Sequence, residues 1–242
     1  MGKIGNLELN RIYQMDCIEG MRLLPDDSVD MVVTDPPYNI GYIPQRKLKS
    51  EGGYARNGIA NDNLSETEFM SWLDNVCFEI DRVLKDNSYV FMFCGWSTIY
   101  QFQPILQKYW TVKALHIWKK NVFGIGYYSR PQYEPFFMCM KGKPEKPKKA
   151  PSDVWEYKKV YKSKKNPHVH SCQKPVDLLE DIIKIYGNGT NIILEPFAGS
   201  GSTCIASLRT GRHFIGFECE PEYIEIANKR LENVLDELKN EM

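Results

Sequence analysis

Residues 192–203 read IILEPFAGSGST, an apolar run followed by a glycine-rich turn and by residues that favour the start of a helix. A short apolar run that ends in such a turn is typical of a buried strand in an α/β fold. Glycines in the turn let a ligand approach the backbone closely, at the carboxyl edge of the sheet where α/β proteins bind ligands. A tight structural turn is the alternative for a G-x-G loop taken alone. The stretch therefore predicts the fold class and marks one place to look for a ligand.

The rest of the chain repeats this alternation of short strands with longer helices. Apolar stretches that predict strands cover residues 11–15, 29–34, 88–94, 111–118, 133–140, 190–194 and 213–217. Stretches with helical spacing of apolar residues cover 17–24, 66–84, 97–108, 175–186, 202–210 and 221–238. Such alternation predicts a doubly wound α/β fold, with a mostly parallel sheet and helices on both faces.

The length of 242 residues and the 43% of apolar residues suffice for one large α/β domain or two small ones. We expect a single domain over residues 1–242. Two stretches interrupt the alternation. Residues 39–64 are rich in Gly, Asn and charged residues, and a loop of this length in a compact domain is usually functional or disordered. Residues 141–173 contain four prolines and are long enough for a small inserted recognition element only.

The charges are balanced over the whole chain, with 31 basic and 31 acidic residues, but not along it. Residues 141–165 hold ten lysines and three acids, a net charge of 10 − 3 = +7. A basic segment on a neutral protein indicates an edge that faces a polyanion, although a solvated lysine loop is an equally ordinary interpretation.

Seven cysteines are scattered without a C-x-x-C pair, which favours reduced thiols in a cytosolic protein over a disulfide framework or a zinc module. The chain shows no signal segment and no apolar run of about 18 residues, so we expect a soluble, cytoplasmic protein without a membrane partner. His168 and His170 form an H-x-H pair without an evident third ligand, so no metal is expected.

An acid follows the glycine turn at the spacing of a nucleotide site. The predicted strand 213–217 ends in Glu218, 19 positions after Gly199, where doubly wound proteins place the acid that binds ribose hydroxyls. Dinucleotide sites carry a third glycine, and here Cys204 occupies that position, which disfavours a nicotinamide-dependent oxidoreductase. The turn has no Lys or Arg and no G-K-[ST] sequence, so a nucleoside without phosphates, such as S-adenosylmethionine, fits it better.

A second unusual stretch, Asp35-Pro36-Pro37-Tyr38, follows the predicted strand 29–34 and so lies at the same sheet edge. The prolines fix φ and supply no N–H, so the backbone carbonyls there can act as acceptors. A carboxylate beside a rigid carbonyl can clamp an NH₂ group, and Tyr38 offers a face on which a flat ring can stack. The alternative is a rigid turn with an ordinary surface tyrosine. Such a clamp suits the exocyclic amine of a nucleobase. Methylation of cytosine at C5 would instead need a cysteine nucleophile, which typically follows a proline, and no Pro-Cys pair occurs in the sequence.

Together, Asp35-Pro36-Pro37-Tyr38 and Phe197-x-Gly199-x-Gly201 resemble the motifs of the amino-group DNA methyltransferases, which modify adenine N6 or cytosine N4. The tetrapeptide comes first and the glycine loop last, which resembles the circularly permuted β class. The resemblance implies a Rossmann-like methyltransferase fold with an antiparallel edge hairpin, S-adenosylmethionine as cofactor, S-adenosylhomocysteine as product and double-stranded DNA as substrate. The target base has to leave the duplex stack to reach the tetrapeptide.

The resemblance also assigns roles to single residues. Met15-Asp16-Cys17 is similar to a Gly-Asp turn whose acid meets the cofactor adenine, although Met15 departs from the pattern. Gln173-Lys174-Pro175 resembles a Q-K-P motif whose lysine lies near the methionine carboxylate. Residues 123–134 resemble the strand-turn-strand beside the target pocket. The expected catalytic residues are Asp35, Pro36, Pro37 and Tyr38, and the expected cofactor-binding residues are Asp16, Asp35, Lys174, Glu195, Phe197, Gly199, Ser200, Gly201, Ser202, Thr203 and Glu218.

Asp before Pro-Pro-Tyr goes mostly with adenine N6 in this class and Ser with cytosine N4, so Asp35 favours adenine. We expect the loop 39–64 to be mobile and to close over the flipped base, and residues 141–173 to recognise the DNA target. The resemblance allows a homodimer and a cognate restriction endonuclease. A non-catalytic DNA-binding protein on the same scaffold, and methylation of RNA or of protein glutamine, are the alternatives from other classes.

Overall fold

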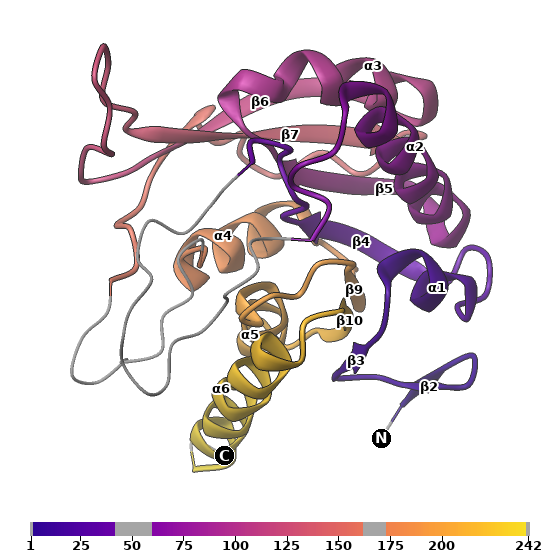
Figure 1. Cartoon of the computed structure of the whole chain (residues 1–242). Coiled ribbons are helices and arrows are strands. Elements are labelled where there is room, and N and C mark those ends of the chain that lie inside the picture. Colours follow the sequence, from indigo (N-terminus) through magenta and orange to yellow (C-terminus); the bar gives the residue numbers. More distant parts are fainter. Residues whose placement is uncertain (1, 42–59, 162–172, 241–242) are drawn as a thin grey trace.

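A computed structural model of the chain describes residues 2–41, 60–161 and 173–240 (Figure 1). The strands are β1 (Lys3–Ile4), β2 (Leu7–Glu8), β3 (Arg11–Gln14), β4 (Val29–Thr34), β5 (Leu84–Phe93), β6 (Thr111–Lys119), β7 (Tyr133–Lys141), β8 (Val154–Glu156), β9 (Ile192–Glu195) and β10 (His213–Glu218). The helices are α1 (Cys17–Arg22), α2 (Glu66–Val83), α3 (Ile99–Tyr109), α4 (Val176–Tyr186), α5 (Ser202–Arg209) and α6 (Pro221–Asn240), with a 3₁₀ turn at Trp96–Thr98. Most of the loop 39–64, part of the segment 141–173, and both His168 and His170 lie outside the described residues.

Eight strands form one sheet in the order β3-β10-β9-β4-β5-β7-β6-β8. Strands β3, β10, β9, β4 and β5 run parallel to one another, and β7 is antiparallel to both β5 and β6. The predicted doubly wound, mostly parallel fold with an antiparallel hairpin is therefore confirmed. One detail differs, because β8 pairs parallel to β6 and so lies outside the β6–β7 hairpin at the edge.

The helices cover both faces of the sheet, as the alternation predicts (Figure 1). One core cluster joins α1, α2 and α3 to the sheet, and the other joins α4, α5 and α6 to its opposite face. Strands β4 and β5 lie between the two clusters, and their apolar runs, such as Val90–Phe93, are fully buried. Central strands with continuous apolar sequence are expected where both faces are covered.

Local sequence signals fix several helix starts. A capping box is present at Ser65 and Glu68, since the Ser65 hydroxyl accepts from the Glu68 N–H and the Glu68 carboxylate accepts from the Ser65 N–H. Asp16 caps α1 with its side chain alone, which accepts from the N–H groups of Ile18 and Glu19. None of the helices in the described part of the chain is both long and apolar enough to cross a membrane.

The topology brings chemically active residues to one edge of the sheet. In a parallel sheet the carboxyl ends of neighbouring strands lie together. Here Asp35 follows β4, Glu195 ends β9 and Glu218 ends β10. These three strands are neighbours in the sheet, so both predicted motifs are placed at the same edge.

Candidate active site

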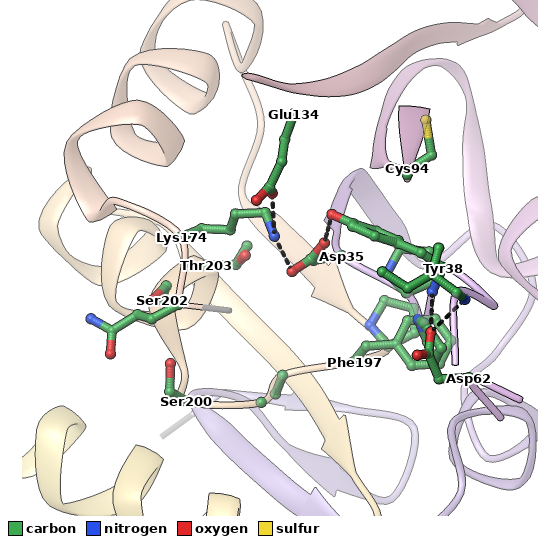
Figure 2. Close-up of a pocket in the computed structure, with 18 of the residues that line it drawn as sticks. Asp35, Tyr38, Asp62, Cys94, Glu134, Lys174, Phe197, Ser200, Ser202 and Thr203 are labelled. Atoms are coloured by element: carbon green, nitrogen blue, oxygen red, sulfur yellow. Dashed lines mark hydrogen bonds and ion pairs between the residues drawn. The ribbon is translucent and has the colours of Figure 1, made fainter. Parts of the chain in front are cut away.

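A cavity of about 560 Å³ opens at this edge of the sheet. Residues 35–38 line one part of it and residues 197–200 line another, so the two motifs are side by side although about 160 residues separate them. All the predicted site residues line the cavity except Gly201: Asp16, Asp35, Pro36, Pro37, Tyr38, Lys174, Glu195, Phe197, Gly199, Ser200, Ser202, Thr203 and Glu218. Figure 2 shows the labelled members of this set around the cavity.

The two glycines of the turn, Gly199 and Gly201, have different structural roles. Gly199 has φ +50°, and a Cβ on it would meet only Phe197 O at 3.9 Å, so its backbone is open to a close approach. Gly201 has φ +78° and precedes α5, and a Cβ there would lie 3.1 Å from the Ala227 Cβ of α6. Gly201 therefore serves the packing of α5 against α6 and is not among the residues that line the cavity, and its expected contact with a cofactor stays a prediction.

Glu218 is tied to the glycine turn. Its Oε2 accepts from the Gly199 N–H at 2.8 Å and its Oε1 accepts from the Glu220 N–H at 2.8 Å. Burial raises the pKa of Glu218, while these N–H groups act in the opposite direction. The carboxylate is thus held at the cavity wall beside the turn, in the position that its spacing from Gly199 predicts.

Both carboxyl oxygens of Glu195 accept hydrogen bonds from groups of the chain itself. Its Oε1 accepts from Thr34 Oγ1 at 2.6 Å and from the Phe197 N–H at 3.1 Å, and its Oε2 accepts from Thr203 Oγ1 at 2.7 Å. Burial raises the pKa of Glu195 to about 8, against the lowering by these hydrogen bonds. The carboxyl group therefore joins β4, β9 and α5, a bracing function that the sequence pattern did not indicate.

Arg230 of α6 donates hydrogen bonds to the glycine turn at Ser200. Its Nη1 donates to the Ser200 carbonyl oxygen and to Ser200 Oγ at 3.0 Å, and it lies 3.3 Å from Ser202 Oγ. Burial lowers the pKa of Arg230 to about 10. This residue was not expected from the sequence, although its helical spacing from Tyr223 and Ala227 places it on the inner face of α6.

Both oxygens of Asp35 are engaged. Oδ1 accepts from the Tyr38 hydroxyl at 2.5 Å, and Oδ2 accepts from the Lys174 ammonium group (Figure 2). Burial raises the pKa of Asp35, Lys174 acts against this rise, and Glu134 adds to it. Burial and the charge of Asp35 raise the pKa of Tyr38 well above its usual value, so its hydroxyl remains a donor. Tyr38 is thus both a ring beside the cavity and a hydrogen-bond donor to the carboxylate.

Lys174 lies deep in the site, with only 5% of its side chain exposed. Besides Asp35, its Nζ contacts Glu134 Oε2 at 3.1 Å, and Glu134 Oε1 in turn contacts Lys120 Nζ at 2.5 Å. The structure therefore assembles an alternating row of charges from three distant parts of the chain, since Lys120 and Glu134 belong to the same end of the β6–β7 hairpin. The sequence motif predicts Lys174 near a cofactor, whereas no motif marks Lys120.

Asp62 holds the tetrapeptide in place from the far end of the loop 39–64. Its Oδ1 accepts from the Tyr38 N–H at 3.0 Å and from the Ile40 N–H at 3.4 Å, and its carbonyl oxygen accepts from the Gly41 N–H at 2.7 Å. With 3% of the residue exposed, Asp62 is a buried turn-forming residue that no sequence pattern indicated. The described ends of the loop therefore meet at the cavity.

Within residues 2–41, 60–161 and 173–240, no group of three or more His, Cys, Asp or Glu side chains is arranged to hold a metal ion. The chemistry available at the cavity is that of carboxylates, a buried ammonium group, aromatic faces and an accessible glycine backbone.

Comparison with known proteins agrees with this geometry. YubD, a candidate methylase of Escherichia coli (strain K12), is 33% identical over 92% of this chain and 90% of its own length. YhdJ, a DNA adenine methyltransferase of the same organism, is 28% identical over 95% of this chain and 85% of its own length. A solved structure of TTHA0409, a candidate DNA modification methylase from Thermus thermophilus complexed with S-adenosyl-L-methionine, superposes with a TM-score of 0.68.

TTHA0409 is 22% identical to this chain, and the match covers 93% of each protein, so this likeness shows the fold alone. The family described as DNA methylase, of the N6 and N4 amino-methyltransferase type, matches residues 29–229. That range contains both motifs and most of the cavity wall. The chain therefore belongs to the N6/N4 DNA methylase family.

Proposed function

We propose that this protein transfers a methyl group from S-adenosylmethionine to the exocyclic N6 of adenine in double-stranded DNA, with the target base flipped out of the helix. The observation that carries the proposal is the single cavity that Asp35–Tyr38 and Phe197–Ser200 line together. Its volume of about 560 Å³ lies within the range of small-molecule sites, roughly 300–1,000 Å³. A methyl donor and a flipped base have to meet in one enclosed place, and this is the place that the fold supplies.

The residues around the glycine turn fit S-adenosylmethionine. Glu218 and Asp16 are carboxylates at the cavity wall, suited to accept hydrogen bonds from ribose hydroxyls and an adenine amino group. Residues 197–203 carry no Lys or Arg that could pair with a phosphate, and Gly199 leaves room for a close approach. When bound, this cofactor supplies an electrophilic methyl group on a sulfonium. The solved complex of TTHA0409 with S-adenosyl-L-methionine supports the assignment.

The tetrapeptide supplies the other half of the reaction. Methyl transfer would leave the electron pair of the broken carbon–sulfur bond on sulfur and would give the amine nitrogen a positive charge, which the nitrogen loses when it releases a proton to water. Asp35 is placed to accept a hydrogen bond from the amine and to stabilise that charge. Tyr38 fixes one oxygen of the carboxylate through its hydroxyl group. Pro36 and Pro37 hold the turn rigid between these two side chains.

Adenine N6 is favoured over cytosine N4 by Asp35 at the first position of the tetrapeptide, and the similarity to the DNA adenine methyltransferase YhdJ supports the same choice. We further propose that the segment 141–173 recognises the DNA target and that the loop 39–64 closes over the flipped base. A homodimer, a cognate restriction endonuclease and a cytoplasmic location also belong to this proposal.

Single-molecule sequencing of DNA from cells that express the chain tests the proposed function directly. We expect N6-methyladenine at one short recurring sequence, absent from cells that carry the empty vector. N4-methylcytosine at such a sequence would overturn the choice of adenine. Unmodified DNA from cells with abundant folded protein would count against the whole proposal.

A further inference from the structure

Lys174 places an ammonium group at the point where the proposed function puts the target amine. Its Nζ donates to Asp35 Oδ2, and it lies 5.5 Å from the centroid of the Tyr38 ring and 5.1 Å from that of Phe93. A carboxylate with two aromatic faces is a favourable environment for a nitrogen cation. The site in this structure therefore holds a stand-in for the positively charged amine that methyl transfer creates.

The two nitrogens compete for one place. The target amine needs an oxygen of Asp35, and both oxygens already have donors, Tyr38 on Oδ1 and Lys174 on Oδ2. An ammonium group that stayed beside the amine would repel the positive charge that develops there, and such repulsion is strong in a poorly hydrated site. Lys174 therefore has to leave Asp35 when the base enters, and it needs a second acceptor within reach.

Glu134 is that acceptor. Its Oε2 is 3.1 Å from Lys174 Nζ (Figure 2), and its Oε1 is fixed by Lys120 at 2.5 Å. Lys120 is itself held over the Trp118 ring, 5.0 Å from its centroid. Glu134 also sits on β7, where it pairs with Trp118 of β6, so its backbone has little freedom. Burial raises the pKa of Glu134, but Lys174 and Lys120 outweigh it, so the carboxylate stays ionised.

We propose that Glu134 is a positioning residue for methyl transfer, which receives the Lys174 ammonium group when the target amine displaces it from Asp35. This inference rests on the proposed function, because it names the movement that admits the amine. Glu134 acts through Lys174 and touches neither the methyl donor nor the reacting nitrogen. Because Lys174 Nζ already contacts both carboxylates, the exchange is a small side-chain shift.

The first test replaces the receiving carboxylate with its neutral isostere. In Glu134→Gln, Lys174 keeps Asp35 as its charged partner, and we expect kcat to fall about 10- to 100-fold, as for loss of a charge-assisted hydrogen bond. The KM for S-adenosylmethionine should stay within about threefold, since Glu134 does not hold the cofactor. Glu156→Gln is the matched control, because Glu156 pairs with Lys119 at 2.8 Å between β8 and β6 and does not line the cavity.

A double-mutant cycle with Lys174→Met separates this function from a general structural one. Once Lys174 is neutral, no ammonium group needs a receiver, so adding Glu134→Gln to Lys174→Met should change kcat by less than about threefold. An equal loss in both backgrounds would overturn the inference. Thermal unfolding of each variant shows whether a loss reflects folding instead.

Binding of the flipped target base compares the same variants without measuring methyl transfer. The probe is a duplex with 2-aminopurine next to the target adenine, whose fluorescence rises when the adenine leaves the stack, and a matched duplex has purine, which lacks the 6-amino group, at the target position. We expect the wild type to capture adenine more strongly than purine, as measured by the fluorescence titration. Glu134→Gln should reduce this preference for adenine about tenfold. In the Lys174→Met background, adding Glu134→Gln should leave the preference unchanged. An unchanged preference in Glu134→Gln contradicts the proposal, even if both Lys174 variants are inactive.

The pH profile supplies a third, signed readout. The groups that act on Asp35 are Lys174, Glu134 and Tyr38, with Glu195 and Cys94 also facing it. Because Glu134 raises the pKa of Asp35 and Lys174 lowers it, the acid limb of kcat/KM should move to lower pH in Glu134→Gln and to higher pH in Lys174→Met. Movement of the acid limb in the same direction in both variants would overturn the inference. If the wild type methylates no adenine, the proposed function fails; if it does and Glu134→Gln matches it, only this inference fails.

Discussion

Asp35 is the residue on which the proposed reaction depends most. In Asp35→Ala the amine loses its acceptor, and we expect methylation to fall by at least about 10²- to 10³-fold, as when a preorganised electrostatic group is removed. Glu134 still compensates Lys174 in this variant, so the fold should persist. Incorporation of tritiated methyl into DNA measures the loss, and calorimetry should show that S-adenosylmethionine binding largely survives. The matched control is Asp86→Ala, whose side chain is 80% exposed.

Tyr38 is expected to stack on the flipped base as well as to fix Asp35. Tyr38→Phe removes the hydroxyl group and keeps the ring, whereas Tyr38→Ala removes both. We expect Tyr38→Phe to lower kcat while 2-aminopurine at the target position still becomes fluorescent, and Tyr38→Ala to lose most of that signal, since stacking contributes roughly 1–3 kcal/mol per base. Equal signals in the two variants would show that the ring does not hold the base.

Glu195 gives the protein a pH-dependent stability. Its folded-state pKa of about 8 lies above the usual value of 4.5, because the folded protein favours the protonated carboxyl group. The contribution of Glu195 to the free energy of unfolding is therefore fully present below pH 4.5 and is lost as pH rises through 8. The difference between these values corresponds to roughly 5 kcal/mol. Glu195→Gln keeps an acceptor for Thr34, and the Thr203 hydroxyl can rotate to accept from the new amide. Urea unfolding from pH 5 to 8.5 should show the wild type losing stability relative to Glu195→Gln.

At the scale of the residue, the sequence indicated the two motifs because each is local and chemically unusual. It placed Glu134 only at the end of the stretch 123–134 beside the expected target pocket, and it could not indicate the ion-pair partners of Glu134, which lie just after β6 and before α4. Lys174 and Asp35, which bond directly, are 139 positions apart. Pairings of this kind arise from the topology and leave no short pattern to detect.

Among the elements, α5 depends on the glycine before it. We expect Gly201→Ala to destabilise the protein by roughly 2–4 kcal/mol, about 1–2 for the positive φ and the rest for overpacking against Ala227. Gly211→Ala is the control, because Gly211 has a similar φ of +72° and no atom within 4 Å of the added Cβ. Urea unfolding measures the difference between the two variants, and equal losses would show that contact with α6 is unimportant.

The predicted elements agree with the structure to within a few residues, because their hydrophobic periodicity is strong. Strand β8 escaped prediction, since its three residues lie in a segment of prolines and lysines and become a strand only by pairing with β6. The start of β5 at Leu84 was also missed, because α2 passes directly into the strand without a turn. Short strands and abrupt junctions are set by tertiary pairing, which local sequence does not encode.

For the molecule as a whole, the proposed DNA contact predicts a salt-dependent affinity. Lys158 is exposed in the basic part of the segment 141–173, next to the cavity-lining Lys159. We expect Lys158→Glu to weaken DNA binding and to reduce the slope of log K against log salt by about 1, as for the loss of a phosphate contact. Fluorescence anisotropy between about 50 and 200 mM salt measures it. Lys239→Glu on α6 is the control and should change neither quantity.

Strand β9 occupies the middle of the sheet, between β10 and β4, yet it comes near the end of the chain. During synthesis on the ribosome, β4 and β5 emerge long before β9, the neighbour of β4 in the sheet. Strand β3 likewise stays unpaired until its neighbour β10 emerges. Until then one edge of β4 presents unpaired backbone and apolar side chains, which favours aggregation of the nascent chain. We therefore expect the interval of synthesis between the emergence of β5 and that of β9 to be the period in which this protein most needs a chaperone.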